Sequence, residues 1–271
     1  MKSKVKNSIF TLIKIALAFV IVFPVLIAII VSFQTMDEIY RLPYRLTLEN
    51  PSFDNFIYAF QNMNLFVYLK NTLIQILLRV PCQIITSLLA AYAFSYFEFP
   101  FKNTLFAIMI AAMMIPGEAV TITVFKMVVN WQMVDTYWGL SINALVSVGA
   151  AFMFRQAMLS TPRALFEAAR IDGCGRMQYF VKILVPVCKS IIISQMILSL
   201  IGTYNDYMWP LLVTTRDAMR TVQTGIVYLM GVANTGYTMA AVLIVLALPV
   251  LLFIFGLDYI MEGVTAGAVK S

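Results

Sequence analysis

The sequence predicts an all-α, polytopic membrane protein, and three observations support this class. Hydrophobic residues make up 61% of the 271 residues, mean hydropathy is +0.87, and only 12% of residues are charged. A soluble domain has roughly a quarter charged residues and about half apolar ones. Several apolar runs also reach the roughly 20 residues that a helix needs to cross about 30 Å of hydrocarbon. We therefore expect a single transmembrane domain over residues 1–271 with six spanning helices.

The first predicted span covers residues 9–33 and follows the basic start MKSKVKN. Basic residues before an apolar run also mark secretory signal peptides. The apolar run here is about 25 residues long, whereas a signal-peptide core has roughly 7–15, and no small-x-small cleavage site follows it. We therefore expect an uncleaved membrane span.

The second predicted span, residues 71–96, comes after the longest connection, residues 34–70. This connection contains an amphipathic, aromatic-rich segment near Phe53 to Phe60. Aromatic side chains favour the membrane interface. A helix that covers the outer end of the bundle is the favoured interpretation, and a ligand site is the alternative.

The remaining predicted spans cover residues 104–127, 140–159, 183–212 and 238–260. Pro116 should either kink the third of the six spans or break it and turn carbonyl groups toward a cavity, because proline cannot donate a backbone hydrogen bond. The polar segment of about residues 160–182 is expected to form a loop between the fourth and fifth spans.

Lys and Arg in the short loops predict the orientation, because cytoplasmic loops carry more of them. With six spans and the N-terminus inside, ten of these residues lie on the cytoplasmic side and six lie outside. The cytoplasmic ones are Lys2, Lys4, Lys6, Lys102, Arg155, Arg163, Arg170, Arg176, Lys182 and Lys270, and the outer ones are Arg41, Arg45, Lys70, Lys126, Arg216 and Arg220. We therefore expect both termini in the cytoplasm.

Composition argues against several classes of function. The chain contains no histidine, which is the commonest zinc ligand and the usual general base. Its three cysteines, Cys82, Cys174 and Cys188, have no metal-ligand spacing. The net charge of +6 fits the bias of cytoplasmic loops better than nucleic-acid binding. We expect no metal site, no nucleic-acid partner and no catalytic site in this chain.

A short charged helix and a glycine turn separate two apolar runs in the sequence EAARIDGCGRMQYFVKILVP, residues 167–186. Thr161-Pro162 is a suitable start for this helix, with the Thr oxygen as a cap and Pro at the first helical position. Gly173 suits a left-handed stop about ten residues later.

Two different faces are expected on this helix. Arg163, Glu167 and Arg170 share one sector, where the pairs Arg163–Glu167 and Glu167–Arg170 would each contribute a few tenths of a kcal/mol. The remainder carries mostly small residues, namely Ala164, Leu165, Ala168, Ala169 and Ile171. Small residues let another surface approach closely but anchor poorly in lipid. A docking element is therefore favoured over a helix that lies on the bilayer.

The same stretch resembles the cytoplasmic loop signature of binding-protein-dependent ABC importer permeases. That signature is E-A-A, three residues, Gly, nine residues and I-x-L-P. Here it is Glu167-Ala168-Ala169, Gly173, Ile183 and Pro186, with Val185 where the pattern has Leu.

Other segments are similar to the carbohydrate-uptake branch of that family, the maltose and glycerol-phosphate type. They are FRQAMLSTPRALFEAARIDG (Phe154 to Gly173), YNDYMWPLL (Tyr204 to Leu212), MIPGEAVTI (Met114 to Ile122) and GVTAGAVK (Gly263 to Lys270). Tyr204 stands where Trp is more usual, and Val264 replaces Leu. The resemblance covers nearly the whole chain and implies the type I ABC importer permease fold.

In that family the loop forms a coupling helix seated in a cleft of an ATP-binding subunit, which implies this role for about Arg163 to Arg176. The residues that the resemblance assigns to ATPase coupling are Arg163, Glu167, Ala168, Ala169, Asp172, Gly173, Arg176 and Pro186. Glu167 would pair either with a basic group of the ATPase or with Arg163. The resemblance also implies that Thr265, Ala266, Gly267 and Lys270 enter the ATPase dimer interface, although such tails often lack fixed structure.

The chain contains no Walker A sequence, G-x-x-x-x-G-K-[ST], so ATP must be bound elsewhere. The resemblance implies two ATP-binding subunits that hold ATP and Mg, and a second, related permease that forms a heterodimer with this chain. It also implies an extracytoplasmic substrate-binding protein and a location in the lipid bilayer of the bacterial plasma (inner) membrane. The cargo would be a sugar, oligosaccharide, polyol or glycerol-phosphate compound, moved by ATP-driven alternating access.

Polar residues inside spans are candidates for the translocation pathway, because burying them in lipid is costly. The candidates are Tyr204, Asn205, Asp206 and Trp209 in the fifth span, Glu118 in the third, and Gln83 with Arg79 and Gln75 in the second. The aromatic, amide and carboxylate groups of the fifth span suit a polyhydroxylated substrate, or they form an aromatic belt at the outer membrane interface.

An ATP-independent secondary transporter or channel is the main alternative function. Such proteins often have internal repeats or paired intramembrane charges, and no repeat is evident in this sequence. An intramembrane enzyme is disfavoured by the missing histidine and the scattered acidic residues.

Overall fold

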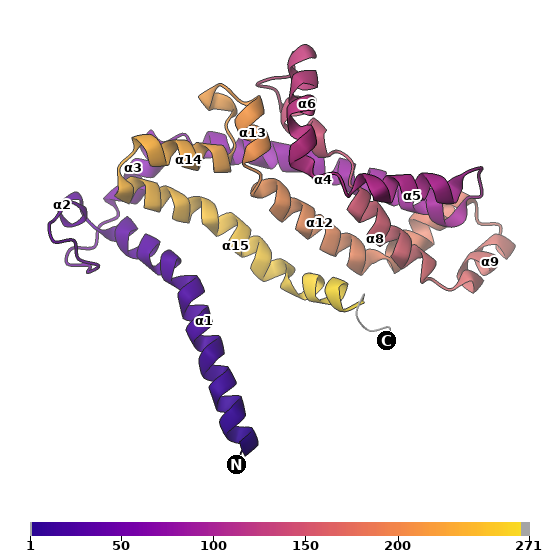
Figure 1. The fold of residues 1–271 in the computed structure, drawn as a ribbon, viewed down its shortest axis with the longest axis horizontal. Coiled ribbons are helices and arrows are strands. Elements are labelled where there is room, and N and C mark those ends of the chain that lie inside the picture. Colours follow the sequence, from indigo (N-terminus) through magenta and orange to yellow (C-terminus); the bar gives the residue numbers. More distant parts are fainter. Residues whose placement is uncertain (1, 267–271) are drawn as a thin grey trace. The chain divides into compact units, whose positions relative to one another are not determined.

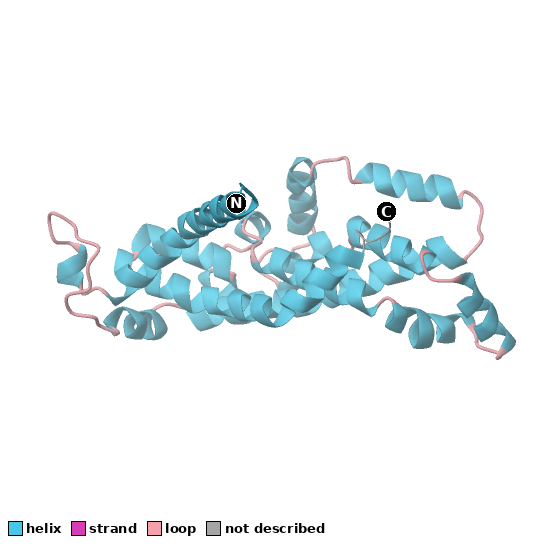
Figure 2. Ribbon diagram, turned by 90° about the horizontal axis from the view of Figure 1, so that it is seen from below, coloured by secondary structure: helices cyan, strands magenta, loops and turns pink. Residues whose placement is uncertain are grey.

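The computed structural model describes residues 2–266, with side chains for residues 10–251 and Ile254. All regular structure in that range is helical, which confirms the all-α class (Figure 2). The elements, labelled in Figure 1 where there is room, are α1 (Lys2–Phe33), α2 (Met36–Ile39), α3 (Asp54–Asn62), α4 (Leu65–Tyr96), α5 (Lys102–Ala112), α6 (Gly117–Asn130), α7 (Tyr137–Ser141), η1 (Ile142–Ala144), α8 (Val148–Leu159), α9 (Arg163–Ile171), α10 (Arg176–Tyr179), η2 (Phe180–Leu184), α11 (Val185–Val187), α12 (Lys189–Tyr204), α13 (Met208–Val213), η3 (Asp217–Met219), α14 (Val222–Val232) and α15 (Thr235–Ala266).

The chain divides into two compact units. Unit one contains the chain up to Phe66 together with Thr224–Leu248, and unit two contains Val67–Gln223 together with the chain from Pro249. Unit one therefore holds the first predicted span and most of the long connection of residues 34–70. Unit two holds α4 to α13, which include the predicted coupling loop and pathway residues.

Two continuous helical segments are long and apolar enough to cross a membrane, Phe10–Phe33 and Leu65–Tyr96. Three further candidates consist of two helices each, bent by 95° between α5 and α6, by 50° between η1 and α8, and by 77° between α11 and α12. Counting each bent pair as one span gives up to five within the described residues. The predicted sixth span, 238–260, falls in α15, where side chains are described only as far as Leu251 and at Ile254.

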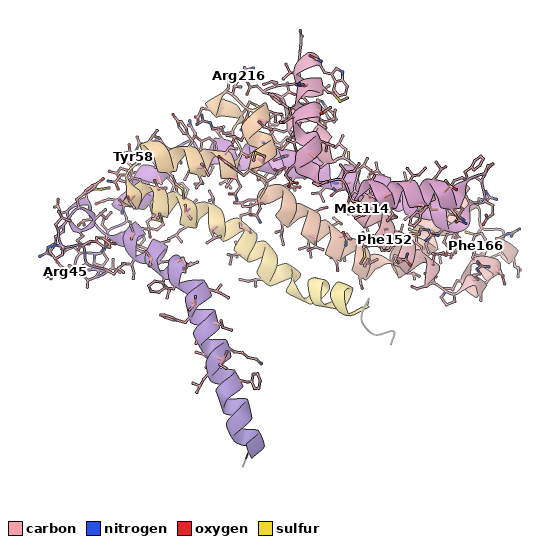
Figure 3. The ribbon with its side chains drawn as sticks, viewed as in Figure 1. Arg45, Tyr58, Met114, Phe152, Phe166 and Arg216 are labelled. Atoms are coloured by element: carbon pink, nitrogen blue, oxygen red, sulfur yellow. The ribbon has the colours of Figure 1, made fainter. Side chains whose placement is uncertain are left out.

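The third predicted span is broken at Pro116 rather than kinked. Helix α5 ends at Ala112, α6 begins at Gly117, and Met114 between them is 85% exposed (Figure 3). Pro24 and Pro81 lie inside the continuous helices α1 and α4, so proline alone does not cause such a break. At Pro116 the following Gly117 adds a second residue that disfavours helix.

The fifth predicted span, 183–212, is interrupted twice. Residues Phe180–Leu184 form a π-helix that ends two residues before Pro186, and Pro186 has no N–H to donate to the carbonyl of residue 182. The chain then bends by 77° at Cys188. A second break separates α12, which ends at Tyr204, from α13, which begins at Met208.

Buried polar side chains in unit one fix the connection that follows α1. The Asn55 amide nitrogen donates to the carbonyls of Ser32 at 2.9 Å and Gln34 at 2.8 Å, which lie at the end of α1. The Glu38 carboxylate accepts the backbone N–H of Asn50 at 2.7 Å. Tyr58, labelled in Figure 3, stacks on Tyr237 with ring centroids 3.8 Å apart. The predicted amphipathic helix is present as α3, and these contacts make the connection a fixed structure.

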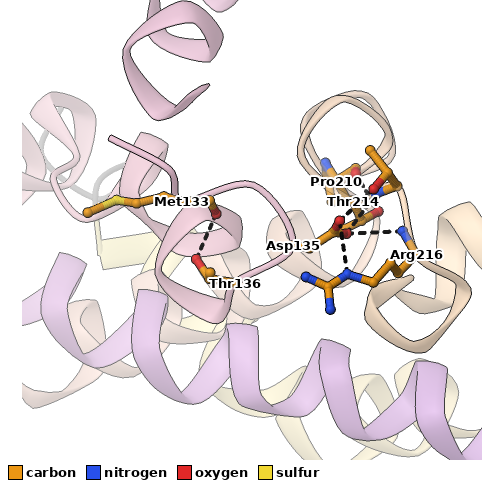
Figure 4. A network of polar contacts seen from close by, with 7 residues as sticks. Met133, Asp135, Thr136, Pro210, Thr214 and Arg216 are labelled. Atoms are coloured by element: carbon orange, nitrogen blue, oxygen red, sulfur yellow. Dashed lines mark hydrogen bonds and ion pairs between the residues drawn. The ribbon is translucent and has the colours of Figure 1, made fainter. Parts of the chain in front are cut away.

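Unit two contains a similar network around Asp135, between α6 and α7 (Figure 4). One oxygen of its carboxylate accepts the backbone N–H groups of Thr215 at 2.7 Å and Arg216 at 3.1 Å. The other oxygen accepts the Thr215 hydroxyl and Arg216 Nε, the latter at 3.3 Å. Asp135 itself has φ of +57°, a conformation that Asp and Asn adopt more readily than most residues. The network ties the loop after α13 to the loop before α7.

Replacing Asp135 with asparagine should destabilise unit two by about 1–3 kcal/mol at neutral pH, because hydrogen bonds to a charged group contribute roughly that much. Burial opposes ionisation of Asp135, but the bonds from Thr215 and Arg216 outweigh it and lower the pKa of the carboxyl below the usual 3.8. A lowered folded-state pKa stabilises the fold above pH 3.8, and this stability is lost as the pH falls through the lowered pKa.

Thermal unfolding of the purified subunit at pH 7 and at about pH 3 checks this prediction. The difference between wild type and Asp135→Asn should be large at pH 7 and should narrow at the lower pH. A difference that is independent of pH would show that the charge of Asp135 does not contribute.

Candidate coupling loop and translocation pathway

Helix α9 forms the predicted short helix, but its start differs from the prediction. The first helical residue is Arg163, and Pro162 stands at the cap position with no side-chain hydrogen bond to the helix. The Thr161 hydroxyl instead donates to the carbonyl of Ala157 at 3.3 Å, on the preceding helix α8. The Thr161 cap prediction is therefore wrong, because that hydroxyl completes the end of α8.

The predicted glycine stop of α9 is confirmed. Gly173 has φ of +76° and its N–H donates to Arg170 O at 3.1 Å. The N–H of Cys174 donates to Ala169 O at 2.8 Å. These two bonds form a Schellman motif, which satisfies carbonyls at the helix end and reverses the chain direction. The turn leads into α10 at Arg176.

Aromatic packing attaches α9 to the rest of unit two. The Phe166 ring, labelled in Figure 3, lies with its centroid 5.3 Å from Tyr96 of α4 and 5.0 Å from Tyr179 of α10. Tyr179 is only 1% exposed, and Ala169 is buried next to this contact. One side of α9 is therefore a packing surface within the subunit.

Other apolar residues of α9 are left exposed in the part of the chain that the structure describes. Leu165 is 41% exposed and Ile171 is 86% exposed, and Ala168 between them is also exposed. An exposed apolar surface beside small residues is typical of a protein contact or of a membrane contact.

The predicted ion pairs along α9 do not form. Within the described part of the chain, no ion pair joins Glu167 to Arg163 or Arg170. The Arg170 guanidinium lies over the Phe166 ring instead, 5.9 Å from its centroid. Glu167 is exposed, so its carboxylate is accessible to a partner.

Three of the predicted coupling residues, Asp172, Arg176 and Pro186, follow α9 in the chain. The Arg176 guanidinium lies 5.0 Å from the Phe97 ring centroid, and the Tyr92 hydroxyl donates to Arg176 O at 2.8 Å. Asp172 is the residue after the last turn of α9 and is exposed. Pro186 lies beyond the π-helix, in α11. The structure thus brings Arg163 to Arg176 into one loop and places Pro186 at the start of the next segment.

The C-terminal residues assigned to the ATPase interface fall mostly outside what the structure describes. Thr265 and Ala266 end helix α15, and their side chains are not described. Gly267 and Lys270 lie outside the described residues.

Two of the pathway candidates form an ion pair that sequence reasoning did not connect. Arg79 Nη1 on α4 donates to Asp206 Oδ2 at 2.7 Å. Their side chains are 15% and 17% exposed. Asp206 lies in the break between α12 and α13, where irregular backbone in a transporter often forms a binding site. The spacing of 127 residues hides this pairing from local pattern analysis.

The remaining polar candidates occupy different surroundings. Gln83, one turn after Arg79 in α4, accepts a hydrogen bond from the Ser199 hydroxyl of α12. Asn205 is exposed and accepts from Gln223 Nε2 at 3.3 Å. Glu118 is exposed in the first turn of α6. The buried Gln75 donates to the carbonyl of Leu140 at 3.0 Å and so joins α4 to α7.

The two large aromatic candidates are packed within the subunit. Trp209 is 3% exposed, its indole N–H donates to the carbonyl of Gly139 at 3.0 Å, and it packs with Val128, Leu140 and Val213. Tyr204 is also 3% exposed. Both rings are therefore packed inside the subunit and flank the break at Asp206.

Two kinds of sequence similarity support one family. The family model described as "Binding-protein-dependent transport system inner membrane component" matches residues 83–265. The arabinooligosaccharides transport system permease protein AraQ of Halalkalibacterium halodurans is 31% identical over 259 residues, 94% of this chain and 93% of that protein. The sn-glycerol-3-phosphate transport system permease protein UgpE of Rhizobium meliloti is 31% identical over 232 residues, 83% of this chain and 82% of that protein.

A solved structure shows the same fold. The crystal structure of a bacterial ABC transporter involved in the import of the acidic polysaccharide alginate has a chain that matches with a TM-score of 0.83. The match covers 95% of this chain and 97% of that one at 16% sequence identity. At this identity the likeness concerns the fold.

Proposed function

This chain belongs to the family of binding-protein-dependent transport system inner membrane components, and we propose that it imports a sugar, oligosaccharide, polyol or glycerol-phosphate compound. It is a transport permease of the ABC class and not an enzyme. The cargo class follows from its relatives, which are named for arabinooligosaccharides and for sn-glycerol 3-phosphate.

The observation that best supports ATP-driven transport is the exposed side of α9. Phe166 and Ala169 fix the helix to its own subunit, while Leu165, Ala168 and Ile171 remain exposed. A rigidly held helix with an uncovered apolar side can transmit a movement of a bound partner into the bundle. We propose that this partner is an ATP-binding subunit, that ATP and Mg are bound there, and that α9 and both chain termini lie in the cytoplasm.

A second permease subunit is proposed from two exposed helices. Only 17% of the most apolar stretch within Phe10–Phe33 of α1 is buried, and α5 has no buried residue among those described. In a bilayer such helices contact either lipid or another subunit. Pairing with a related permease, together with an extracytoplasmic binding protein, would complete an importer with an inward-facing and an outward-facing state.

Reconstitution of the subunit into liposomes with its partner permease, ATP-binding subunits and binding protein tests this proposal. Uptake of a labelled saccharide or glycerol phosphate should require both ATP and the ATP-binding subunits. Uptake that continues at the same rate after the ATP-binding subunits are omitted would instead identify an ATP-independent transporter.

A further inference from the structure

The ion pair between Arg79 and Asp206 is isolated within apolar sequence. Arg79 is the only charged residue between Lys70 and Glu98, and Asp206 is the only one between Lys189 and Arg216. Burying a charged side chain within the membrane costs free energy unless the charge is paired. Charged residues inside spans are therefore candidates for a transport pathway. Arg79 Nη1 and Asp206 Oδ2 are 2.7 Å apart, so the two charges are paired. The side chains of Arg79 and Asp206 are 15% and 17% exposed, so part of each remains accessible.

Uncharged polar side chains of α4 share the face of Arg79, with Gln75 buried against the Leu140 carbonyl and Gln83 partly exposed. Gln75, Arg79, Gln83 and Thr86 recur at intervals of three or four residues, so they share one face of α4. Across from this face, the Ser199 hydroxyl of α12 donates to Gln83. The partly exposed side chains of the ion pair, of Gln83 and of Ser199 therefore offer hydrogen-bond donors and acceptors but no net charge.

We propose that Arg79 and Asp206 determine which charge the cargo of this permease can have; this inference rests on the proposed function. The permease passes uncharged polyhydroxylated molecules and rejects molecules that carry a phosphate or a carboxylate. A guanidinium has five N–H donors and a carboxylate has several acceptor positions, so an ion pair can still bind hydroxyl groups. An anion that approaches Arg79 meets the Asp206 carboxylate next to it. In surroundings of low dielectric this repulsion cancels most of the attraction to the guanidinium.

This specificity separates this chain from some of its own relatives. An arabinooligosaccharide is uncharged, whereas sn-glycerol 3-phosphate and alginate are anionic. Family membership therefore does not decide between a neutral and an anionic cargo. In our proposal, the paired charges at the break between α12 and α13 make this distinction.

The test compares uptake of neutral and anionic probes by the complete importer in liposomes. The probes are labelled arabinotriose, sn-glycerol 3-phosphate and an alginate oligosaccharide. Wild type should take up the neutral probe in an ATP-dependent manner, with uptake of either anionic probe at least tenfold lower. The variant Asp206→Asn leaves Arg79 as an unpaired cation, so neutral uptake should fall about tenfold and sn-glycerol 3-phosphate should become at least a tenfold stronger competitor.

The double variant Arg79→Gln with Asp206→Asn is the matched control. It removes both charges and keeps a polar side chain at each position, so sn-glycerol 3-phosphate should again compete as weakly as it does in wild type. Wild-type uptake of an anionic probe at a rate comparable to the neutral one would overturn the inference and leave the importer assignment standing. Unchanged selectivity in Asp206→Asn would also overturn it. If no probe enters with ATP, the proposed cargo class fails, and this inference fails with it.

Discussion

Replacing Gly173 with valine is expected to abolish ATP-driven uptake while the subunit still folds and inserts into the membrane. A Cβ at this position would meet no heavy atom within 4 Å, so the effect comes from the backbone alone. The φ of +76° is strained for a β-branched residue, at a cost of about 1–3 kcal/mol. Relief of this strain breaks the two hydrogen bonds that end α9, and the chain then leaves α9 in another direction.

A graded series separates this backbone effect from side-chain bulk. Asparagine tolerates positive φ better than alanine, and alanine better than valine. Uptake should therefore decrease in the order Gly, Asn, Ala, Val, with Asn within about threefold of wild type and Val reduced more than tenfold. Membrane insertion and thermal stability of the isolated subunit are measured in parallel.

Gly175 provides a matched control two residues away. It has φ of −69°, which any residue adopts, and a Cβ there would also meet nothing within 4 Å. The variant Gly175→Ala should therefore transport normally. Wild-type uptake by Gly173→Val, or equal damage from Gly175→Ala, would contradict the role of this turn.

Local sequence signals predicted the helical class and the positions of several helix ends, but not the bends inside the predicted spans. The apolar runs predicted the helical class and Gly173 predicted the end of α9, while Pro116 marked the position of the break between α5 and α6 but left a kink equally open. Each of these features depends on residues that are neighbours in the chain, through hydrophobic periodicity, a positive φ or a missing N–H.

Features that depend on tertiary contacts were not predictable in the same way. Glu167 and Arg170 have the spacing of a helical ion pair, but the Arg170 guanidinium lies over the Phe166 ring instead. Trp209 is a pathway candidate by sequence, but its ring packs against Leu140 and is buried. Arg79 and Asp206 were both identified as polar residues inside spans, yet only the fold shows that they meet. Spacing along the sequence contains no information on which distant segments touch.

The second prediction concerns the exposed side of α9, where Ile171→Asp should detach the ATP-binding subunit from an otherwise intact permease. Ile171 is 86% exposed, so its replacement removes almost no packing within the subunit, and exposed substitutions change stability by about 0.5 kcal/mol or less. A buried anchor at an interface contributes about 2 kcal/mol or more, which corresponds to at least a thirtyfold loss of affinity.

Recovery of the ATP-binding subunit with affinity-purified permease measures this loss directly, and thermal unfolding of the permease alone shows that the fold is retained. Ile171→Leu preserves an apolar side chain of the same volume and should retain the partner and uptake. A helix that lies on the bilayer gives the opposite pattern, because an aspartate would then weaken the contact of α9 with lipid and leave recovery of the ATP-binding subunit unchanged. That result would reject the docking role of α9, whereas loss of the partner with a stable permease places Ile171 in the contact.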